Sequence, residues 1–456
     1  MKKNHKIYSD ASQEEVAEDI KPLLEFQENG LELNELKRLV NDRLIPHFVR
    51  YDNDGFFSLY NFFPETGAEY GAEVALKYNQ GVTNWQVSPG GAVLEELCCG
   101  ALCRLFGFGP QSDATFMYSG TYANQEALYL ALHKKAEQNE FDLGQKGLKG
   151  FKDPEKLTVV TSPEAHFSVN HAVRILGLGE QSIVTLPVDE NRRIDTRTMK
   201  DDLKKIRKTR DIFCVVITAG TTSTGSIDPI LPAVKICRDI NTWVHVDAAY
   251  GLAYSILPEF KSKFEGIDQA DSVTWDPHKQ FGVPIPNSVL FVSNKSDFDR
   301  IAVFSEYFNR KDESVPNPGL KSPPSTRPLS ALPLVTTIRH LGMKKITERL
   351  RAPVKAISQL ADFLDNELET EVMHKPDIGI LCIRITPKNF PENQLDELQK
   401  YIYKRAQIEG KYTVSMSKIS NSVVLRFLTL SPDVTFDKLK ETVIYLQRLA
   451  LGFHHK

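Results

Sequence analysis

The hydrophobic positions between residues 81 and 300 fall in short, nearly continuous runs, without strict alternation of apolar and polar residues. Six of these runs are rich in β-branched residues: 158–160, 183–185, 213–217, 243–246, 272–275 and 289–292. Stretches with the apolar spacing of helices lie between them: 93–106, 123–138, 168–176, 201–207 and 231–239. Apolar strands separated by helices are typical of a mostly parallel sheet that is covered on both faces. The pattern therefore predicts an α/β fold.

The pattern changes on both sides of this region. Residues 12–45 have helical spacing, and we expect residues 1–80 to form an N-terminal helical segment, either an arm that packs on a partner subunit or a solvated helix pair. Residues 303–328 contain five prolines and a charged run at 310–313, which predicts a long mobile loop. This loop would form the C-terminal end of a large domain that spans residues 81–328.

The C-terminal region, residues 329–456, predicts a smaller α/β domain. Helical spacing covers 329–350, 355–368 and 436–451, and strands are expected at 378–385 and 423–428.

The composition narrows the class of protein. The chain has 456 residues, 41% of them hydrophobic and 25% charged, with a formal net charge of −3, as in ordinary globular proteins. It has no basic stripe for nucleic acid and no apolar run near the ~20 residues of a membrane span. The six cysteines form no Cys-x-x-Cys pair and no zinc-type spacing with histidine, so we expect no metal site. No apolar segment follows the basic N-terminus, so we expect a cytoplasmic protein.

Two residues carry the strongest chemical signal. Lys279 ends the run Trp-Asp-Pro-His-Lys at 275–279, and Asp247 lies in the run His-Val-Asp-Ala-Ala-Tyr at 245–250. Each follows a short apolar run expected to be a buried strand. A lysine amine can hold the aldehyde carbon of pyridoxal phosphate as a Schiff base, while a carboxylate keeps the pyridine nitrogen protonated. The pair therefore points to pyridoxal phosphate chemistry.

Three further segments end strands in the same region. Residues 117–124 end a strand and open a helix, which suits either a phosphate dianion or an ordinary helix cap. His166 follows the strand near 159–162, where its ring could lie on a cofactor or simply pack. Residues 219–229 form a glycine- and threonine-rich turn. Because ligands bind beyond the carboxyl ends of strands in open α/β sheets, these segments predict one shared site.

In these motifs the chain resembles the group II pyridoxal phosphate-dependent amino acid decarboxylases, the family of glutamate, aromatic amino acid and cysteine sulfinate decarboxylases. The resemblance also rests on Phe-Phe-Pro at 62–64, on the segments 83–90 and 94–96, and on Leu-Arg at 425–426. It implies the type I aminotransferase fold, with a mostly parallel seven-stranded sheet in the large domain. It also implies pyridoxal 5'-phosphate as cofactor and a homodimer with the active site at the subunit interface.

The resemblance also implies roles for single residues. Lys279 would carry the cofactor aldehyde and Asp247 would pair with its ring nitrogen, with His166 and Ala249 on opposite faces of the ring. Lys279 should then have a lowered pKa, because burial and the cationic ring disfavour its charge. The other residues expected to bind the cofactor are Gly120, Thr121, Thr222, Asp276 and His278. The residues expected to bind substrate are Phe63, Arg327 and Arg426.

The implied reaction is decarboxylation of an L-amino acid to its amine and CO₂. Glu65 would suit a substrate with a cationic side chain. The segment 309–326 has no tyrosine or histidine where well-studied relatives carry a proton-donating loop tyrosine, so Tyr307, His278 and Lys279 are the alternative donors.

Because of that difference, an oxidative deaminase remains an alternative. Ser-Thr-Arg-Pro at 325–328 also resembles the sphingosine phosphate lyases, so a carbon–carbon lyase on the same scaffold remains a second alternative. A non-catalytic homologue is a third, and the retained Lys279, Asp247 and His166 argue against it.

Overall fold

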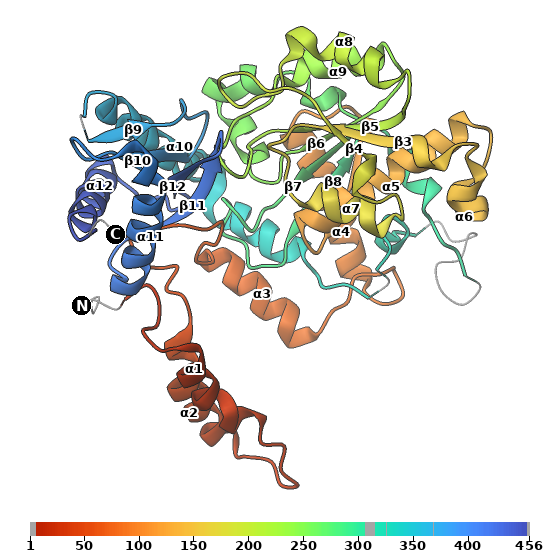
Figure 1. The fold of residues 1–456 in the computed structure, drawn as a ribbon. Helices are drawn as coiled ribbons and strands as arrows, with labels where there is room; N and C mark the ends of the chain where they lie inside the picture. Colours follow the sequence, from red (N-terminus) through yellow and green to blue (C-terminus); the bar gives the residue numbers. More distant parts are fainter. Residues whose placement is uncertain (1–5, 306–314, 325, 368, 454–456) are drawn as a thin grey trace.

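The computed structural model describes residues 6–305, 315–324, 326–367 and 369–453 (Figure 1). Residue 307 and the charged run 310–313 of the expected mobile loop lie outside these ranges. The next part of that loop, from residue 315, is fixed to the body of the protein. Trp85 N donates to Pro316 O over 3.1 Å, and Gly319 N donates to Thr83 O over 2.7 Å.

The large domain contains a seven-stranded sheet in the order β2-β8-β7-β6-β5-β3-β4. The run from β7 through β6, β5 and β3 to β4 is parallel, while β8 is antiparallel to both of its neighbours, β2 and β7. The strands are β2 (Asp113–Met117), β3 (Leu157–Thr161), β4 (Ile183–Thr185), β5 (Asp211–Thr218), β6 (Trp243–Asp247), β7 (Ser272–Trp275) and β8 (Ser288–Val292). The predicted α/β fold with a mostly parallel seven-stranded sheet is confirmed.

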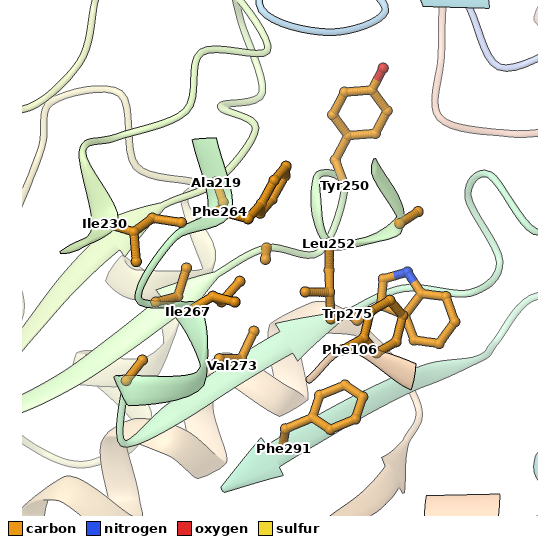
Figure 2. Close-up of a cluster of buried hydrophobic side chains, with 14 of the residues drawn as sticks. Phe106, Ala219, Ile230, Tyr250, Leu252, Phe264, Ile267, Val273, Trp275 and Phe291 are labelled. Atoms are coloured by element: carbon orange, nitrogen blue, oxygen red, sulfur yellow. The ribbon is translucent and has the colours of Figure 1, made fainter. Parts of the chain in front are cut away.

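Helices cover both faces of this sheet, which explains why its strands are apolar throughout. In β5, Val215 and Ile217 join the core packed under α4, α8 and α9. The alternate residues Cys214 and Val216 join the core under α5 and α7. Figure 2 shows part of the first core, with Val273, Trp275 and Phe291 of neighbouring strands. The helices of this domain are α4 (Pro89–Leu105), α5 (Gly120–Gln138), α6 (Leu143–Lys146), α7 (Ser168–Ile175), α8 (Thr196–Ile206) and α9 (Ile230–Arg238).

A second, five-stranded sheet has the order β1-β11-β12-β10-β9. Its core lies against helices of the C-terminal region. The strands are β1 (Phe56–Phe57), β9 (Thr370–Val372), β10 (Ile380–Ile385), β11 (Thr413–Ile419) and β12 (Ser422–Leu428), and the helices are α10 (Ala331–Leu364), α11 (Leu395–Glu409) and α12 (Phe436–Ala450). Because β1 pairs in parallel with β11, residues near position 60 are carried to the junction of the two sheets.

The helix boundaries in α10 differ from the prediction. We expected two helices, 329–350 and 355–368, whereas the break lies at Gly342, with φ 69° and ψ 157°. This left-handed φ suits glycine, which has no Cβ. Pro353 lies inside the second helical stretch, which ends at Leu364. The division predicted near the proline was therefore wrong.

The N-terminal segment projects from the body of the molecule (Figure 1). It contains α1 (Gln13–Ile20) and α2 (Leu33–Arg43), and neither helix has a buried residue. The helix α3 (Thr66–Tyr78) follows it and packs on α10. None of the helices within the described ranges is sufficiently long and apolar to cross a lipid bilayer.

Candidate active site

A cavity of about 250 Å³ lies at the carboxyl ends of β5, β6 and β7 and at the N-terminus of α5. All nine residues predicted to bind the cofactor line it. Its described lining is Tyr60, Ser119, Gly120, Thr121, Asn124, His166, Thr218, Gly220, Thr222, Asp247, Ala249, Tyr250, Asp276, His278 and Lys279. The strand ends identified from the sequence therefore meet in one place, as the topology of a parallel sheet requires.

Lys279 places its amine among acidic and aromatic groups. Its Nζ lies 3.0 Å from Asp276 Oδ2 and 4.8 Å from the centroid of the Tyr60 ring. Burial lowers the pKa of this amine, but Asp276, Tyr60 and Asp247 together outweigh burial and raise the pKa above its ordinary value. For the protein groups alone the pKa is therefore raised, while the lowered pKa expected beside the cationic cofactor ring stays a prediction.

Asp247 ends β6 with its carboxylate held on both oxygens. Oδ2 accepts a hydrogen bond from Asn124 Nδ2 over 2.7 Å, and Oδ1 accepts one from Ala249 N over 3.2 Å. The side chain is buried but lines the cavity. A carboxylate fixed in this way can face a protonated ring nitrogen without rearranging.

His166 follows β3 and enters the cavity beside Phe167. Its Nδ1 accepts a hydrogen bond from Ser168 N over 3.2 Å, so Nε2 carries the proton. Burial lowers the pKa of the imidazole more than Asp247 raises it. The ring is therefore neutral near pH 7, and a neutral flat ring suits stacking on a cofactor.

The first turn of α5 forms a cradle for an anion. A Cβ at Gly120 would lie 2.9 Å from Asp276 Oδ2, so only glycine fits there. Ser119 Oγ caps the helix by accepting from Tyr122 N. The amides of Gly120 and Thr121 lie in the turn where a helix leaves its N–H groups without intrahelical acceptors, at the positive end of the macrodipole. This geometry suits a phosphate group.

Asp276 and His278 flank this cradle. Asp276 Oδ1 accepts from Ser288 Oγ over 2.6 Å, and Oδ2 lies 3.7 Å from His278 Nε2. His278 Nδ1 lies 2.5 Å from Asn287 O, so Nδ1 is the donor in that bond. Burial lowers the pKa of His278 more than Asp276 raises it.

Tyr60 is a cavity residue that the sequence analysis missed. It follows β1, donates its hydroxyl to Thr222 O over 3.2 Å, and packs edge-on against Tyr250 with ring centroids 5.1 Å apart. Burial raises the pKa of its phenol, so the hydroxyl stays protonated at neutral pH. The only signal in the sequence was its position two residues before the Phe-Phe-Pro run.

Arg327, predicted to face the substrate or phosphate, is engaged elsewhere. Its guanidinium pairs with the buried Glu95 and donates to Val82 O over 2.8 Å and to Thr115 Oγ1 over 3.1 Å. It does not line the cavity. In this chain it ties the segment after the loop to α4 and β2, which corrects the sequence interpretation.

The other substrate-binding candidates also lie outside the cavity lining. Arg426 lies behind Tyr60, with its Cζ 5.6 Å from that ring, and donates to Ser415 Oγ over 2.7 Å and to the carbonyl oxygen of Thr222. Phe63 is 51% exposed. Glu65 pairs with Arg349, so it does not offer a carboxylate to a substrate, contrary to the sequence interpretation.

The described groups fit pyridoxal phosphate. A buried lysine amine, a fixed carboxylate, a neutral imidazole and a helix N-terminus surround one cavity, and a mostly parallel α/β sheet positions them. This combination defines a pyridoxal phosphate-dependent enzyme of the aminotransferase-type fold.

Comparison with known proteins identifies the family. Residues 18–386 match the pyridoxal-dependent decarboxylase conserved domain. L-2,4-diaminobutyrate decarboxylase from Acinetobacter baumannii is 28% identical over 381 residues, covering 81% of this chain and 74% of that protein. Aromatic-L-amino-acid decarboxylase from Bacillus atrophaeus is 25% identical over 432 residues, covering 93% and 86%.

Solved structures agree with the fold. Mouse CSAD superimposes with a TM-score of 0.88 at 22% identity, covering 98% of this chain and 93% of that one. The chain belongs to the pyridoxal-dependent decarboxylase family. It is an amino acid decarboxylase, a carboxy-lyase with pyridoxal 5'-phosphate as cofactor.

Proposed function

We propose that this enzyme decarboxylates an L-amino acid whose side chain is neutral or cationic, with 2,4-diaminobutyrate as the leading candidate. The charge of the cavity carries this proposal. Lys279 is the only lysine or arginine among the described lining residues, whereas Asp247 and Asp276 are both carboxylates. Arg426 is held by Ser415 and by the Thr222 carbonyl, so it offers little to a second substrate carboxylate. The Acinetobacter baumannii relative is named for decarboxylation of L-2,4-diaminobutyrate.

The roles of the chain's own residues follow from their positions. Pyridoxal phosphate, when bound, supplies an electron sink for the bond that loses CO₂. Lys279 would provide the amine that binds the cofactor aldehyde, and Asp247 would keep the ring nitrogen protonated. His166 would cover one face of the ring and Ala249 the other.

The remaining lining residues orient the cofactor and move protons. The first turn of α5, with Gly120 and Thr121, would hold the phosphate together with His278, and Thr222 would contact the ring side of the cofactor. Lys279 Nζ can take up and release a proton beside Asp276, 3.0 Å away, and it is therefore the donor we favour for the substrate Cα. The Tyr60 ring closes the cavity next to this amine and limits the access of water.

The proposed substrate class is tested with the purified holoenzyme. CO₂ release is measured for 2,4-diaminobutyrate, ornithine, the aromatic amino acids, aspartate, glutamate and cysteine sulfinate. We expect kcat/KM for 2,4-diaminobutyrate to exceed that for each acidic substrate by at least about tenfold, since a buried unpaired carboxylate is strongly disfavoured. A preference for an acidic substrate would refute the charge argument. Release of ammonia and aldehyde in place of amine would identify an oxidative deaminase.

We also propose that the enzyme is a homodimer in which the projecting N-terminal segment packs on the second subunit. This segment exposes large apolar side chains, among them Phe26 at 93% and Leu33 at 62%. Phe26 lies between α1 and α2 and Leu33 begins α2, and exposed large apolar side chains on a segment whose two helices have no buried residue suit an interaction surface. Light scattering should give twice the mass of the chain for the wild type. The Phe26→Asp/Leu33→Asp variant should shift toward the monomer mass, and an unshifted dimer would place the interface elsewhere.

A further inference from the structure

A continuous chain of buried hydrogen bonds leads from Asp247 into the sheet, away from the cavity. Asn124 Nδ2 lies 2.7 Å from Asp247 Oδ2, and Asn124 Oδ1 lies 2.9 Å from His245 Nε2. His245 Nδ1 lies 2.9 Å from Ser272 Oγ, which is 2.9 Å from Trp243 Nε1. The exposed fractions of Asn124, His245 and Ser272 are 1%, 0% and 1%, so water does not compete for these bonds.

The two ends of this chain fix the direction of every bond within it. The carboxylate of Asp247 can only accept, so the amide nitrogen of Asn124 faces it and Oδ1 faces His245. An amide oxygen can only accept, so the imidazole carries its proton on Nε2 and donates it to Asn124 Oδ1. His245 Nδ1 is then an acceptor, so Ser272 Oγ donates to it while accepting from the indole of Trp243, which can only donate. Only one tautomer of His245 satisfies all four bonds.

Burial supports the same assignment. It lowers the pKa of His245 to about 4, although Asp247 raises it, so the imidazole is neutral at physiological pH. The second hydrogen of the Asn124 amide is also used, because Ser168 Oγ lies 2.8 Å from Nδ2. Each polar hydrogen in the chain therefore points toward the carboxylate or toward a named acceptor.

We propose that Trp243, Ser272, His245 and Asn124 are positioning residues that hold the Asp247 carboxylate in the orientation needed to face the ring nitrogen of the cofactor. This inference rests on the proposed role of Asp247. Successive donors in a dry interior polarise one another, which strengthens the N–H bond that reaches Oδ2. Oδ1, which accepts from the Ala249 amide, is then left to face the cavity.

The neighbouring strand provides a matched control. Trp275 lies on β7 and is as deeply buried as the network, but its Nε1 has no hydrogen-bond partner among the described residues. Trp243→Phe and Trp275→Phe therefore remove the same indole from the same sheet. Only the first removes a member of the hydrogen-bonded chain.

The tautomer is measured directly by NMR on cofactor-free protein containing ¹⁵N-labelled histidine, with His245→Gln identifying the resonances. We expect His245 in the wild type to be neutral at pH 7 with its proton on Nε2. Ser272→Ala and Trp243→Phe should leave the proton on Nε2, which still donates to Asn124 Oδ1, but should shift the Nδ1 resonance because its hydrogen-bond donor is lost or weakened. Trp275→Phe should leave the spectrum of His245 unchanged. A protonated His245, or a proton on Nδ1 in the wild type, would overturn the proposal, even if a variant failed to fold.

Cofactor affinity gives the second test. Ser272→Ala should weaken binding of pyridoxal phosphate about threefold to tenfold and Trp243→Phe about twofold to fivefold, the range expected for one hydrogen bond. Trp275→Phe should not change it. Both losses of affinity should vanish in an Asp247→Asn background, because the carboxylate that the hydrogen-bond network orients is then absent. Losses of equal size in both backgrounds would contradict a relay through Asp247, whereas an Asp247→Asn variant with normal affinity would refute the proposed function itself.

Discussion

Helix α5 carries two groups of buried polar side chains, and they differ in how their polar atoms are satisfied. At the cavity end, Asn124 has partners for both ends of its amide. Two residues further on, Glu126 Oε1 has no hydrogen-bond partner among the described residues, and neither does His133 Nε2 about two turns beyond Glu126. Both side chains are nevertheless buried, at 2% and 5% exposed.

The difference separates the buried polar side chains that serve the active site from those that do not. A buried polar atom without a partner costs roughly 1–3 kcal/mol, whereas a satisfied network fixes its members in place. The first group, which includes Asn124, therefore fixes the positions of side chains that line the cavity. The second group, Glu126 and His133, provides no comparable network and lowers stability. Changes in the first group should alter catalysis, and changes in the second should alter unfolding.

The largest expected effect is that of Lys279→Ala. Turnover should fall by about three orders of magnitude or more, because no other described lining residue offers an amine to the cofactor aldehyde. Pyridoxal phosphate should still bind, without a covalent link, since the α5 cradle is unchanged. Borohydride treatment followed by peptide mapping should label position 279 in the wild type only. Undiminished turnover would contradict the assignment of Lys279 as the residue that binds the cofactor aldehyde.

Asp247→Asn should have the next largest effect. The variant keeps the shape of the side chain but cannot hold the ring nitrogen protonated, so kcat should fall by about two orders of magnitude. The absorbance spectrum of the bound cofactor should change with it. Near-normal kinetics would show that a different group keeps the ring electron-poor.

Much of this catalytic region could be predicted from the sequence. The strands ending near Asp247 and Lys279 are short apolar runs bounded by helices, and their carboxyl ends must meet at one edge of a parallel sheet. His245 was also visible as a polar residue inside an apolar strand, two positions before Asp247. Its partner Asn124 could not be predicted, because the pairing depends on how α5 lies on the sheet.

Other features depend on tertiary contacts that no local pattern encodes. Tyr60 reaches the cavity because β1 pairs with β11. The strand β11 was itself missed, since its residues 416–418 are not buried and interrupt the apolar run. Arg327 was expected near the substrate, but the burial of Glu95 on α4 decides its position. The sequence motif was therefore recognisable while the direction of its side chain was not.

Glu126→Gln should stabilise the fold without changing kcat. Burial alone raises the pKa of Glu126 from 4.5 to about 8. Between these values the folded chain binds a proton that the unfolded chain does not, so this group lowers stability progressively as pH rises. Glutamine removes that cost, and the free energy of unfolding should increase by about 1–3 kcal/mol at pH 8 and by little at pH 4.5. Urea titrations at both pH values measure the difference, and a gain independent of pH would contradict this assignment.

His133→Phe should give the smallest effect, with the opposite dependence on pH. Burial lowers the pKa of His133 more than Asp142 raises it, so the unfolded chain takes up a proton near pH 6.5 before the folded chain does. This group therefore lowers stability as pH falls below about 6.5. Phenylalanine keeps the edge contact with Tyr129, whose ring centroid lies 4.5 Å away, and removes the unpartnered nitrogen. The gain should be about 1 kcal/mol or less at pH 5.5 and smaller at pH 8. If the gain in stability instead grew with rising pH, as for Glu126→Gln, the pH dependence would not come from the His133 imidazole alone. Glu126 and His133 would then titrate as one coupled pair.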